Sequence, residues 1–351
     1  MLAKLSIQNF KGIKTCDVDD LRRINLFIGK NDSGKSTILE AAYYLFQELY
    51  SPPKLSEIMR RRTDVFTGGS ELWFNYETDS PIVISATFDS VRLDWRIVAK
   101  QIGAQSVLSS SLFGGRTQIT LLGETQYRGS DFTLTLSAGG RQIDNIRESD
   151  GFKKELLGYA SNMSLIDCTL KLKTREIEGI LAQFKRKPAL EAKFGGILND
   201  VYGKGNEWEF IPQLENTDER RLTIREGGQS KYFSGFGDGL RCCVGIVGNA
   251  MSVKNTALFI EEIESHQHSG SLSKLVKHLV EVVRENDLQV FLSTHSKGVW
   301  ESLHHGVYLE DIDKEKEEFR CFLVERETKT GKVTVEVTDD VQKITRAIGQ
   351  P

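Results

Sequence analysis

A run of eight residues near the N-terminus has the composition and spacing of a phosphate-binding loop. Residues Gly29 to Ser36 read G-K-N-D-S-G-K-S, which fits the pattern G-x-x-x-x-G-K-S in full. Glycines let the backbone wrap closely, so that loop N–H groups and the N-terminus of the next helix bind phosphate oxygens. We expect Lys35 to reach the β- and γ-phosphates of a nucleotide and the Ser36 hydroxyl to ligate Mg²⁺.

Two carboxylates follow an apolar run in the last third of the chain. Residues 257–260 read A-L-F-I, and Glu261 and Glu262 come directly after them. A buried parallel strand delivers the groups at its end to the carboxyl edge of the sheet, where ligands bind. We expect Glu261 to hold the magnesium ion through water, and Glu262 to orient or deprotonate the attacking water.

Two further segments offer groups that can contact phosphate. A glycine-rich run contains Gly237 and Gly239, and it ends 22 residues before Glu261, a distance that fits one helix and one turn. The N-terminus of that helix can receive phosphate. His295 follows another apolar run, 33 residues after Glu262. A histidine beside an apolar strand is more often structural, but this spacing favours donation of a hydrogen bond to a γ-phosphate.

The elements around the phosphate-binding loop are readable from the sequence pattern. Residues 24–28 (I-N-L-F-I) predict a strand, and residues 36–50 predict a helix that Pro52 and Pro53 end. Apolar residues recur along this helix at spacings of three and four, at Leu39, Ala42, Tyr43, Phe46 and Leu49. We therefore expect the helix to pack one face on a sheet.

The middle of the chain has a different sequence pattern from the segment around the phosphate-binding loop. Short alternating runs predict antiparallel strands at 72–76, 82–88, 91–98, 118–122 and 132–136. Residues 152–202 predict helices, interrupted near Pro188 and at Gly195 and Gly196, and a strand pair follows at 208–224. The last third alternates between helices at 240–250 and 272–283 and strands at 257–261 and 289–293. Strand, helix and strand in succession indicate a parallel sheet with helices on its faces.

Composition excludes several classes of protein. The chain has 351 residues, a net charge of −3, 27% charged residues and 39% hydrophobic residues, which excludes collagen-like, disordered and membrane-spanning chains. Five scattered cysteines without a C-x-x-C spacing indicate reduced, buried thiols and no structural zinc site. The opening residues M-L-A-K-L lack the parts of a secretion signal, so we expect a cytoplasmic location and no membrane partner.

Together these motifs resemble one family, the ABC-type ATPases, in the branch of the SMC, RecF and overcoming-lysogenization-defect (OLD) proteins. The resemblance rests on residues 5–13, Gly29–Thr37, the signature-like 237–241 (G-D-G-L-R), the Walker B strand and D-loop at 261–268, and the H-loop at 294–296. The closing segment 321–326 (C-F-L-V-E-R) is similar to that of stand-alone OLD-like ATPases. The resemblance is specific over 1–46 and 231–340 and only topological over 50–230.

The resemblance implies an α/β fold of the P-loop NTPase type. It is an ABC ATPase head with a mostly parallel sheet flanked by helices, an antiparallel β lobe and a helical lobe. One head would span 1–351, with lobes at 1–50 (P-loop), 66–150 (antiparallel), 151–230 (helical insert and connecting strands) and 231–351 (signature to C-terminal sheet). No sustained heptads indicate a coiled coil, and only 56 residues follow the H-loop histidine. We therefore expect any nuclease or toxin to be a separate chain.

The resemblance also implies the ligands and the residues that bind them. ATP is the expected substrate and Mg²⁺ the expected cofactor. The implied nucleotide-binding residues are Gly29, Asn31, Asp32, Ser33, Gly34, Lys35, Ser36, Thr37, Gly237 and Gly239. The catalytic residues would be Lys35, Glu262 and His295, and the metal ligands Ser36 and Glu261. ATP would close a head-to-tail homodimer between the P-loop of one subunit and the signature helix of the other, and hydrolysis would open it.

Some positions depart from the family pattern. The usual signature serine has no clean counterpart, because Ser234 lies one or two positions early. Asp238 puts a negative charge near phosphate, so it must point away or cap its own helix. Glu261 stands where the family usually has aspartate. For the Q-loop glutamine, Gln101 and Gln118 lie in the plausible region, and the sequence does not choose between them.

The target of the ATPase cycle stays open. In one hypothesis the protein engages double-stranded DNA in repair, recombination or anti-phage defence, and the basic clusters at 60–62 and 185–187 bind DNA phosphates. These clusters are equally typical of a solvated face. In the alternative, the chain is a regulatory switch for a separate effector protein and does not contact DNA. A transporter subunit is disfavoured, because an L-S-G-G-Q signature is absent. His266 and His268 could bind a metal, although a D-loop fits them better.

Overall fold

A computed structural model of the chain shows two compact units, each built from separate stretches of sequence. It describes residues 1–50, 72–77, 79–89, 91–101, 119–128, 133–137, 150–169, 179–180, 184, 187–203, 207–212, 220–226, 229–232, 235–307 and 317–349. Unit 1 comprises Met1–Arg22, Gly29–Ser161 and Phe322–Lys343, and unit 2 comprises Arg23–Ile28, Asn162–Cys321 and Ile344–Pro351. The four lobes that the sequence suggests stay a prediction.

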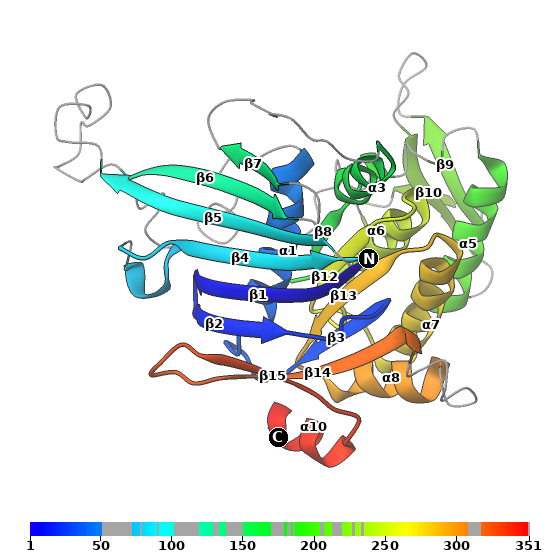
Figure 1. Ribbon diagram of the computed structural model, residues 1–351. Helices are drawn as coiled ribbons and strands as arrows, with labels where there is room; N and C mark the ends of the chain where they lie inside the picture. Colours follow the sequence, from blue (N-terminus) through cyan, green and yellow to red (C-terminus); the bar gives the residue numbers. More distant parts are fainter. Residues whose placement is uncertain are drawn as a thin grey trace, which may run out of the picture. The chain divides into compact units, whose positions relative to one another are not determined.

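An antiparallel sheet forms most of unit 1 (Figure 1). Its strand order is β2-β1-β4-β5-β6-β7. The bounds are β1 (Leu2–Phe10), β2 (Ile13–Val18), β4 (Ile82–Phe88), β5 (Val91–Gln101), β6 (Ile119–Arg128) and β7 (Thr133–Ser137). The four strands predicted between 82 and 136 are therefore confirmed, with ends that differ by at most six residues. Strand β2 was not predicted; it pairs with β1 through a tight turn that brings Phe10 opposite Ile13.

Two helices of unit 1 share an aromatic cluster with this sheet. They are α1 (Lys35–Tyr50), which follows the phosphate-binding loop, and α3 (Asp150–Ser161). Phe46 of α1 contacts Phe88 of β4 and Tyr159 of α3, with ring centroids 6.0 and 5.3 Å apart. These side chains are buried, and α1 also packs on β1. The predicted apolar face of the first helix is confirmed, because Leu39, Ala42 and Phe46 are all buried.

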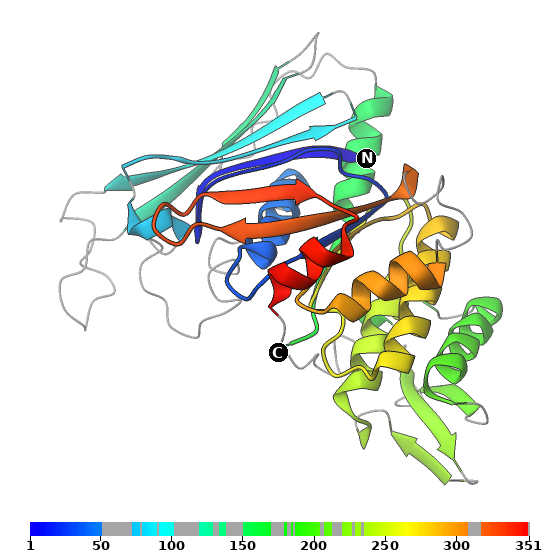
Figure 2. The same ribbon diagram turned by 90° about the horizontal axis from the view of Figure 1, so that it is seen from below.

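The predicted strand at 72–76 is wrong. Phe74–Tyr76 forms the 3-10 turn η2, and Asn75 and Tyr76 have left-handed φ values of 52° and 62°. The hairpin of β14 (Phe319–Arg326) and β15 (Val333–Val337) explains this conformation, because its turn at Gly331 packs tightly against the ring of Phe74. Figure 2 shows the two strands of the hairpin side by side.

Unit 2 contains a parallel sheet in the order β3-β13-β12-β8. Its strands are β3 (Ile24–Ile28), β13 (Gln289–Thr294), β12 (Ala257–Glu261) and β8 (Ser164–Asp167), and each neighbouring pair is parallel. Every residue of β3, β12 and β13 is buried, as expected for strands covered on both faces. The rings of Phe259 and Phe291 stack across β12 and β13 with centroids 4.7 Å apart. The predicted parallel sheet is confirmed.

The helices of unit 2 alternate with these strands in the sequence. They are α6 (Asp238–Ser252), α7 (Ser269–Glu285) and α8 (Lys297–Val307), and α7 packs against both others. The apolar positions of α7 form one buried face at helical spacing, comprising Leu272, Leu275, Val276, Leu279, Val280, Val282 and Val283. The short helix α10 (Val341–Ile348) follows the hairpin. Among the residues that the structure places, no helix is long and apolar enough to cross a bilayer.

Two predictions for the segment 152–202 are wrong. Residues 164–167 were expected to be helical, but they form β8, which pairs with the buried strand β12. Helix α5 (Pro188–Tyr202) was expected to break at Gly195 and Gly196, but it runs through both residues. Gly195 faces Trp208, whose Nε1 donates a hydrogen bond to Asn199, and a Cβ atom at Gly195 would make ordinary contact with the Trp208 side chain at 3.6 Å. Trp208 belongs to a small antiparallel sheet of β9 (Glu207–Pro212), β10 (Arg220–Glu226) and β11 (Gln229–Tyr232).

Candidate ATP-hydrolysis site

The phosphate-binding loop begins directly after the buried strand β3 and belongs to unit 1. A Cβ atom at Gly29 would lie 2.4 Å from the carbonyl oxygen of Val324, so only glycine fits there. Gly34 has φ +102°, a conformation that also favours glycine. The two fixed glycines of the motif therefore have separate physical reasons, close backbone approach and a left-handed turn.

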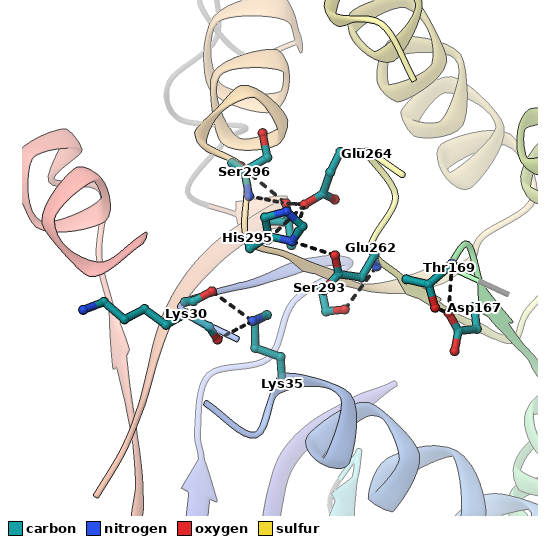
Figure 3. Close-up of polar contacts among 11 residues, drawn as sticks. Lys30, Lys35, Asp167, Thr169, Glu262, Glu264, Ser293, His295 and Ser296 are labelled. Atoms are coloured by element: carbon teal, nitrogen blue, oxygen red, sulfur yellow. Dashed lines mark hydrogen bonds and ion pairs between the residues drawn. The ribbon is translucent and has the colours of Figure 1, made fainter. Parts of the chain in front are cut away.

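The lysine of the loop points back onto the loop itself. Lys35 Nζ donates hydrogen bonds to the carbonyl oxygens of Gly29, at 2.9 Å, and Lys30, at 2.8 Å (Figure 3). Its side chain is buried. The ammonium group is thus held at the inner side of the loop, where it can meet an anion that the loop encloses.

The remaining loop residues differ in exposure. Asn31 and Asp32 are exposed, Ser33 is buried, and Ser36 and Thr37 are half-buried on the first turn of α1. Asp32 has φ +60°, so this exposed carboxylate is presented from a left-handed backbone conformation. The structure thus places each predicted loop residue at the start of α1 or just before it.

A second group of the predicted residues lies in unit 2, at the carboxyl edge of the parallel sheet. The register places Glu261, the last residue of β12, opposite Ser293 of β13. On the other side of β13, Thr294 lies opposite Ile28, the residue that precedes Gly29 in the chain. Strands β12, β13 and β3 therefore end together, and the phosphate-binding loop starts from the edge that carries the Walker B and H-loop residues.

His295 and Glu262 meet at this edge (Figure 3). His295 Nδ1 lies 2.6 Å from Glu262 Oε2, and the imidazole is 48% exposed whereas the carboxylate is 19% exposed. Glu262 has φ +53°, which strains a residue with a Cβ atom. Its N–H donates to the carbonyl oxygen of Ser293 at 3.0 Å, and this bond holds the strained turn in place.

A third polar residue, Glu264, belongs to the same cluster, and sequence reasoning gave it no role. Glu264 Oε1 accepts hydrogen bonds from Thr294 Oγ1 at 2.6 Å and from the His295 backbone N–H at 3.0 Å, and it lies 3.4 Å from His295 Nδ1. Burial raises the pKa of Glu264, and the nearby charge of Glu262 adds to this. The run E-E-I-E was the available signal, because the turn closed by the Ser265 N–H and the Glu262 carbonyl oxygen brings its second and third acids, Glu262 and Glu264, to His295.

Among the residues that the structure describes, Glu262, Glu264 and His295 are the His, Cys, Asp and Glu side chains close enough together to share a metal ion. His266 and His268 do not belong to such a group among those residues. Glu261, the predicted magnesium ligand, is buried at the end of β12. Its carboxylate and the Ser36 hydroxyl are oxygen donors, which is the donor type that Mg²⁺ prefers.

The signature-like residues open helix α6. Gly237 is the residue before the helix, Asp238 is its first residue, and Asp238 Oδ1 lies 4.0 Å from Arg241 Nε. Asp238 therefore sits in the first turn of its own helix, where a negative charge is favourable. Gly239 contacts the D-loop, because a Cβ atom there would lie 2.4 Å from the carbonyl oxygen of His266. A Cβ atom at Gly237 would meet open space.

Some predicted features fall outside the described residues. These are Ser234, Gln118, the basic cluster at 60–62, and Lys185 and Arg186 of the second cluster. Gln101 is the last residue of β5, and Lys187 directly precedes α5. The choice of the Q-loop glutamine and the basic surface therefore stay predictions.

Comparison with known proteins identifies one relative along nearly the whole chain and others along a short segment. An ATP/GTP phosphatase of Helicobacter pylori is 24% identical over 343 residues, covering 89% of this chain and 90% of that protein. The DNA replication and repair protein RecF of Lactobacillus acidophilus is 50% identical over 44 residues, which is 12% of each chain. The similarity to RecF is thus confined to a short segment, whereas the similarity to the phosphatase spans nearly the whole chain.

Solved structures confirm the predicted fold. An SMC head bound to the C-terminal winged-helix domain of ScpA superposes with a TM-score of 0.54 at 15% identity, covering 98% of this chain and 99% of that one. The SMC head of Pyrococcus furiosus gives a TM-score of 0.54 at 12% identity and 97% coverage of both chains. The family model described as "AAA domain, putative AbiEii toxin, Type IV TA system" matches residues 24–299, and the chain belongs to this family, as an ATPase of the SMC- and RecF-like ABC type.

Proposed function

We propose that the loop Gly29–Thr37 binds the triphosphate of ATP and that Lys35 neutralises the β- and γ-phosphates. The buried ammonium of Lys35, held by two loop carbonyl oxygens, supports this role. A triphosphate offers the ammonium stronger, charged acceptors than those carbonyls. Asn31, Asp32, Ser33, Gly34, Ser36 and Thr37 complete the loop. We expect Lys35→Ala to abolish nucleotide binding, measured by titration with a fluorescent ATP analogue.

In the same proposal, Ser36 and Glu261 hold Mg²⁺. Their oxygen donors fit the preference of this ion, and Glu261 differs from the commoner aspartate by one methylene group. When bound, the ion neutralises charge on the phosphates. A Glu261→Gln variant keeps the length of the side chain and loses its charge. We expect it to need a higher Mg²⁺ concentration for half-maximal ATP turnover.

Glu262 orients and deprotonates the attacking water, and His295 donates a hydrogen bond to the γ-phosphate. The observation that carries this proposal is the 2.6 Å contact between the two side chains at the carboxyl ends of β12 and β13. We expect Glu262→Gln to bind ATP without turning it over, and His295→Ala to hydrolyse ATP slowly at nearly unchanged affinity. Equal turnover in wild type and Glu262→Gln would remove Glu262 from this role.

ATP binding closes a homodimer in this proposal, with the helix α6 of one subunit facing the P-loop of the other. Gly237 and Gly239 then present the N-terminus of α6 to phosphate, and the placement of both at the start of a helix supports this. The mass in solution tests the proposal. We expect Glu262→Gln with ATP and Mg²⁺ to double in mass, measured by light scattering, and Lys35→Ala to stay monomeric.

The cycle acts on double-stranded DNA in this proposal, in repair, recombination or anti-phage defence. The short similarity to RecF, a DNA replication and repair protein, supports DNA as the molecule on which the cycle acts. Steady-state ATP turnover with duplex and single-stranded DNA at low and physiological salt tests it. We expect stimulation that fades as salt rises. Charge reversal of Lys185, Arg186 and Lys187 should abolish the stimulation, and reversal of the exposed Lys254, Lys277 and Lys329 is the matched control.

The alternative is a regulatory ATPase that controls a separate effector protein, a nuclease or toxin, without contacting DNA. The family description, which names a putative toxin of a type IV toxin–antitoxin system, favours keeping this candidate. A rate of ATP turnover that does not change when DNA is added would favour this alternative. The partner would then be sought by pull-down on the Glu262→Gln protein with ATP, using Lys35→Ala as the control that does not bind nucleotide.

A further inference from the structure

The imidazole of His295 has two carboxylates on one side of its ring. Glu262 Oε2 lies 2.6 Å from Nδ1, and Glu264 Oε1 lies 3.4 Å from the same nitrogen. Both acceptors face Nδ1, which leaves Nε2 as the nitrogen that can meet a substrate. Since the side chain is 48% exposed, these contacts, rather than tight packing, set the direction of the ring.

The two carboxylates differ in how they are held. Glu262 follows a strained backbone position, and its carboxylate contacts the half-exposed ring of His295. Glu264 is 11% exposed, and its Oε1 also accepts hydrogen bonds from Thr294 Oγ1 and from the His295 backbone N–H. The carboxylate of Glu264 is therefore fixed to the end of β13 and cannot swing away without breaking both bonds.

We propose that Glu264 is a positioning residue for ATP hydrolysis: it holds the H-loop backbone and takes over the Nδ1–H of His295 when Glu262 turns to the attacking water. The inference rests on the proposed roles of Glu262 and His295. The required movement is small, because a charge-assisted N–H···O bond is about 2.7–2.9 Å long and the present separation is 3.4 Å. A shift of roughly 0.5 Å completes the exchange.

This exchange keeps Nε2 directed at the substrate throughout the reaction. If Glu264 were absent, Nδ1 would lose its acceptor at the moment when Glu262 leaves, and the ring would be free to rotate or change tautomer. Misplacement of a catalytic group by about 1 Å can cost about 100-fold in rate. Ground-state binding of ATP depends on the P-loop, so the effect should fall on kcat and leave KM nearly unchanged.

Steady-state kinetics of four variants test the proposal, together with ATP affinity and thermal unfolding. Glu264→Ala removes the carboxylate that accepts from Thr294 and from the His295 backbone and that lies near Nδ1. We expect kcat to fall 10- to 100-fold, with KM and ATP affinity within twofold of wild type. Glu264→Gln keeps an oxygen that Thr294 and the His295 backbone can use, and we expect it to rescue most of the rate. Thr294→Val removes one anchor of Glu264. Glu301→Gln, an exposed glutamate on α8 paired with Lys297, is the control and should match wild type.

The ¹⁵N shifts of the His295 ring, assigned by comparison with His295→Ala, provide a second measurement. We expect one tautomer in wild type and a mixture in Glu264→Ala, a change that a merely structural residue would not cause. A kcat for Glu264→Ala within twofold of wild type would overturn the proposal. A fall in kcat that is accompanied by a loss of ATP affinity and a lower unfolding temperature would also overturn it. Should Glu264→Ala fail to fold, unchanged kcat in both Glu264→Gln and Thr294→Val would overturn it, and a lowered kcat in Thr294→Val alone would support it.

The same series separates this inference from the function on which it rests. If Glu262→Gln and His295→Ala turn over ATP like wild type, the proposed catalytic residues are wrong and Glu264 has nothing to position. If both lose turnover while Glu264→Ala keeps it, the function stands and only the role of Glu264 is refuted. The double variant Glu264→Ala with Thr294→Val should be no slower than Glu264→Ala, because both changes act through one contact.

Discussion

Gly239 and Gly237 lie two residues apart at the start of α6, and the structure predicts opposite outcomes when each is changed to alanine. A methyl group at Gly237 would meet open space, whereas one at Gly239 would lie 2.4 Å from the carbonyl oxygen of His266. The carbonyl oxygen of Gly239 also accepts hydrogen bonds from Tyr202 Oη at 2.6 Å and Gln267 Nε2 at 2.7 Å. Burial raises the pKa of Tyr202, so its hydroxyl stays protonated and remains a donor at neutral pH.

These contacts set the loss in the free energy of unfolding that Gly239→Ala should cause. Ordinary carbon–oxygen contact needs about 3.4 Å, so the D-loop or α6 must move by roughly 1 Å, and such overpacking costs about 1–3 kcal/mol. Weakening two hydrogen bonds costs about 0.5–1.5 kcal/mol each. Alanine regains about 1 kcal/mol over glycine within a helix. The net loss in the free energy of unfolding for Gly239→Ala is therefore about 1–5 kcal/mol, whereas Gly237→Ala should stay within about 1 kcal/mol of wild type.

Thermal unfolding followed by circular dichroism measures the difference. An unfolding entropy of about 2.1 cal/mol/K per residue gives roughly 1.4 °C per kcal/mol for a chain of 351 residues. We therefore expect Gly239→Ala to unfold about 1–7 °C below wild type and Gly237→Ala within about 1.5 °C of it. Tyr202→Phe, which removes one of the two donors, should lie between them. Equal unfolding temperatures for the two glycine variants would refute the close packing of α6 on the D-loop.

Three further predictions concern other parts of the chain. Asp32→Gly should raise the unfolding temperature and tighten ATP binding several-fold in a fluorescent-nucleotide titration, because it removes strain at φ +60° and a carboxylate from the loop; Asp32→Asn, which tolerates this φ, isolates the charge. The hydrogen bond from His278 lowers the pKa of Asp200, so its stabilisation is present above the unfolded value of about 3.8 and is lost as pH falls through the folded value. Asp200→Asn should therefore lower the unfolding temperature at pH 7 and less at pH 3, and an equal loss at both would contradict the pairing. All five buried thiols should react slowly with iodoacetamide in the native protein, and mass spectrometry should find Cys242 first, because its interaction with the Cys168 side chain lowers its pKa; labelling led by Cys16, whose pKa burial raises to about 12, would contradict this.

The parallel sheet and its motifs were predictable because each carries a strong local signal. The strands at 24–28 and 257–261 match β3 and β12 residue for residue, since uninterrupted apolar runs bounded by glycine or acids have few other interpretations. The helix after the P-loop was placed within one residue of α1. In these segments local propensity and tertiary packing agree, which is why the pattern alone sufficed.

The wrong secondary-structure predictions lie where tertiary contacts decide the conformation. Residues 164–167 (S-L-I-D) are too short for a periodic pattern, and they become β8 by pairing with β12. Gly195 looked like a helix breaker, but it lies within α5, whose Asn199 accepts a hydrogen bond from Trp208 of β9. Phe74 lies in a 3-10 turn against Gly331, a residue more than 250 positions away in sequence. No local window contains such partners.

In the candidate site, too, residues in motifs were predictable from the sequence, and a residue defined by tertiary contacts was not. Lys35, Glu262 and His295 were predicted because their motifs have fixed spacing, and the structure places Glu262 against His295. Glu264 belongs to the E-E-I-E run, but the spacing of the run does not show which of its acids meets the H-loop. The two hydrogen bonds that Glu264 accepts come from the end of β13, some thirty residues later in the chain.

The pairing of β3 with β13 has a consequence for how the chain is made. Asn25 of β3 donates a hydrogen bond to Val290 of β13 across 265 residues of sequence. At a synthesis rate of about 5–20 residues per second, β3 waits roughly 13–50 s on the ribosome before this partner emerges. Throughout that interval its apolar side chains, all buried in the finished sheet, have no cover from β13. The strand that leads into the phosphate-binding loop is thus synthesised early and paired with β13 late.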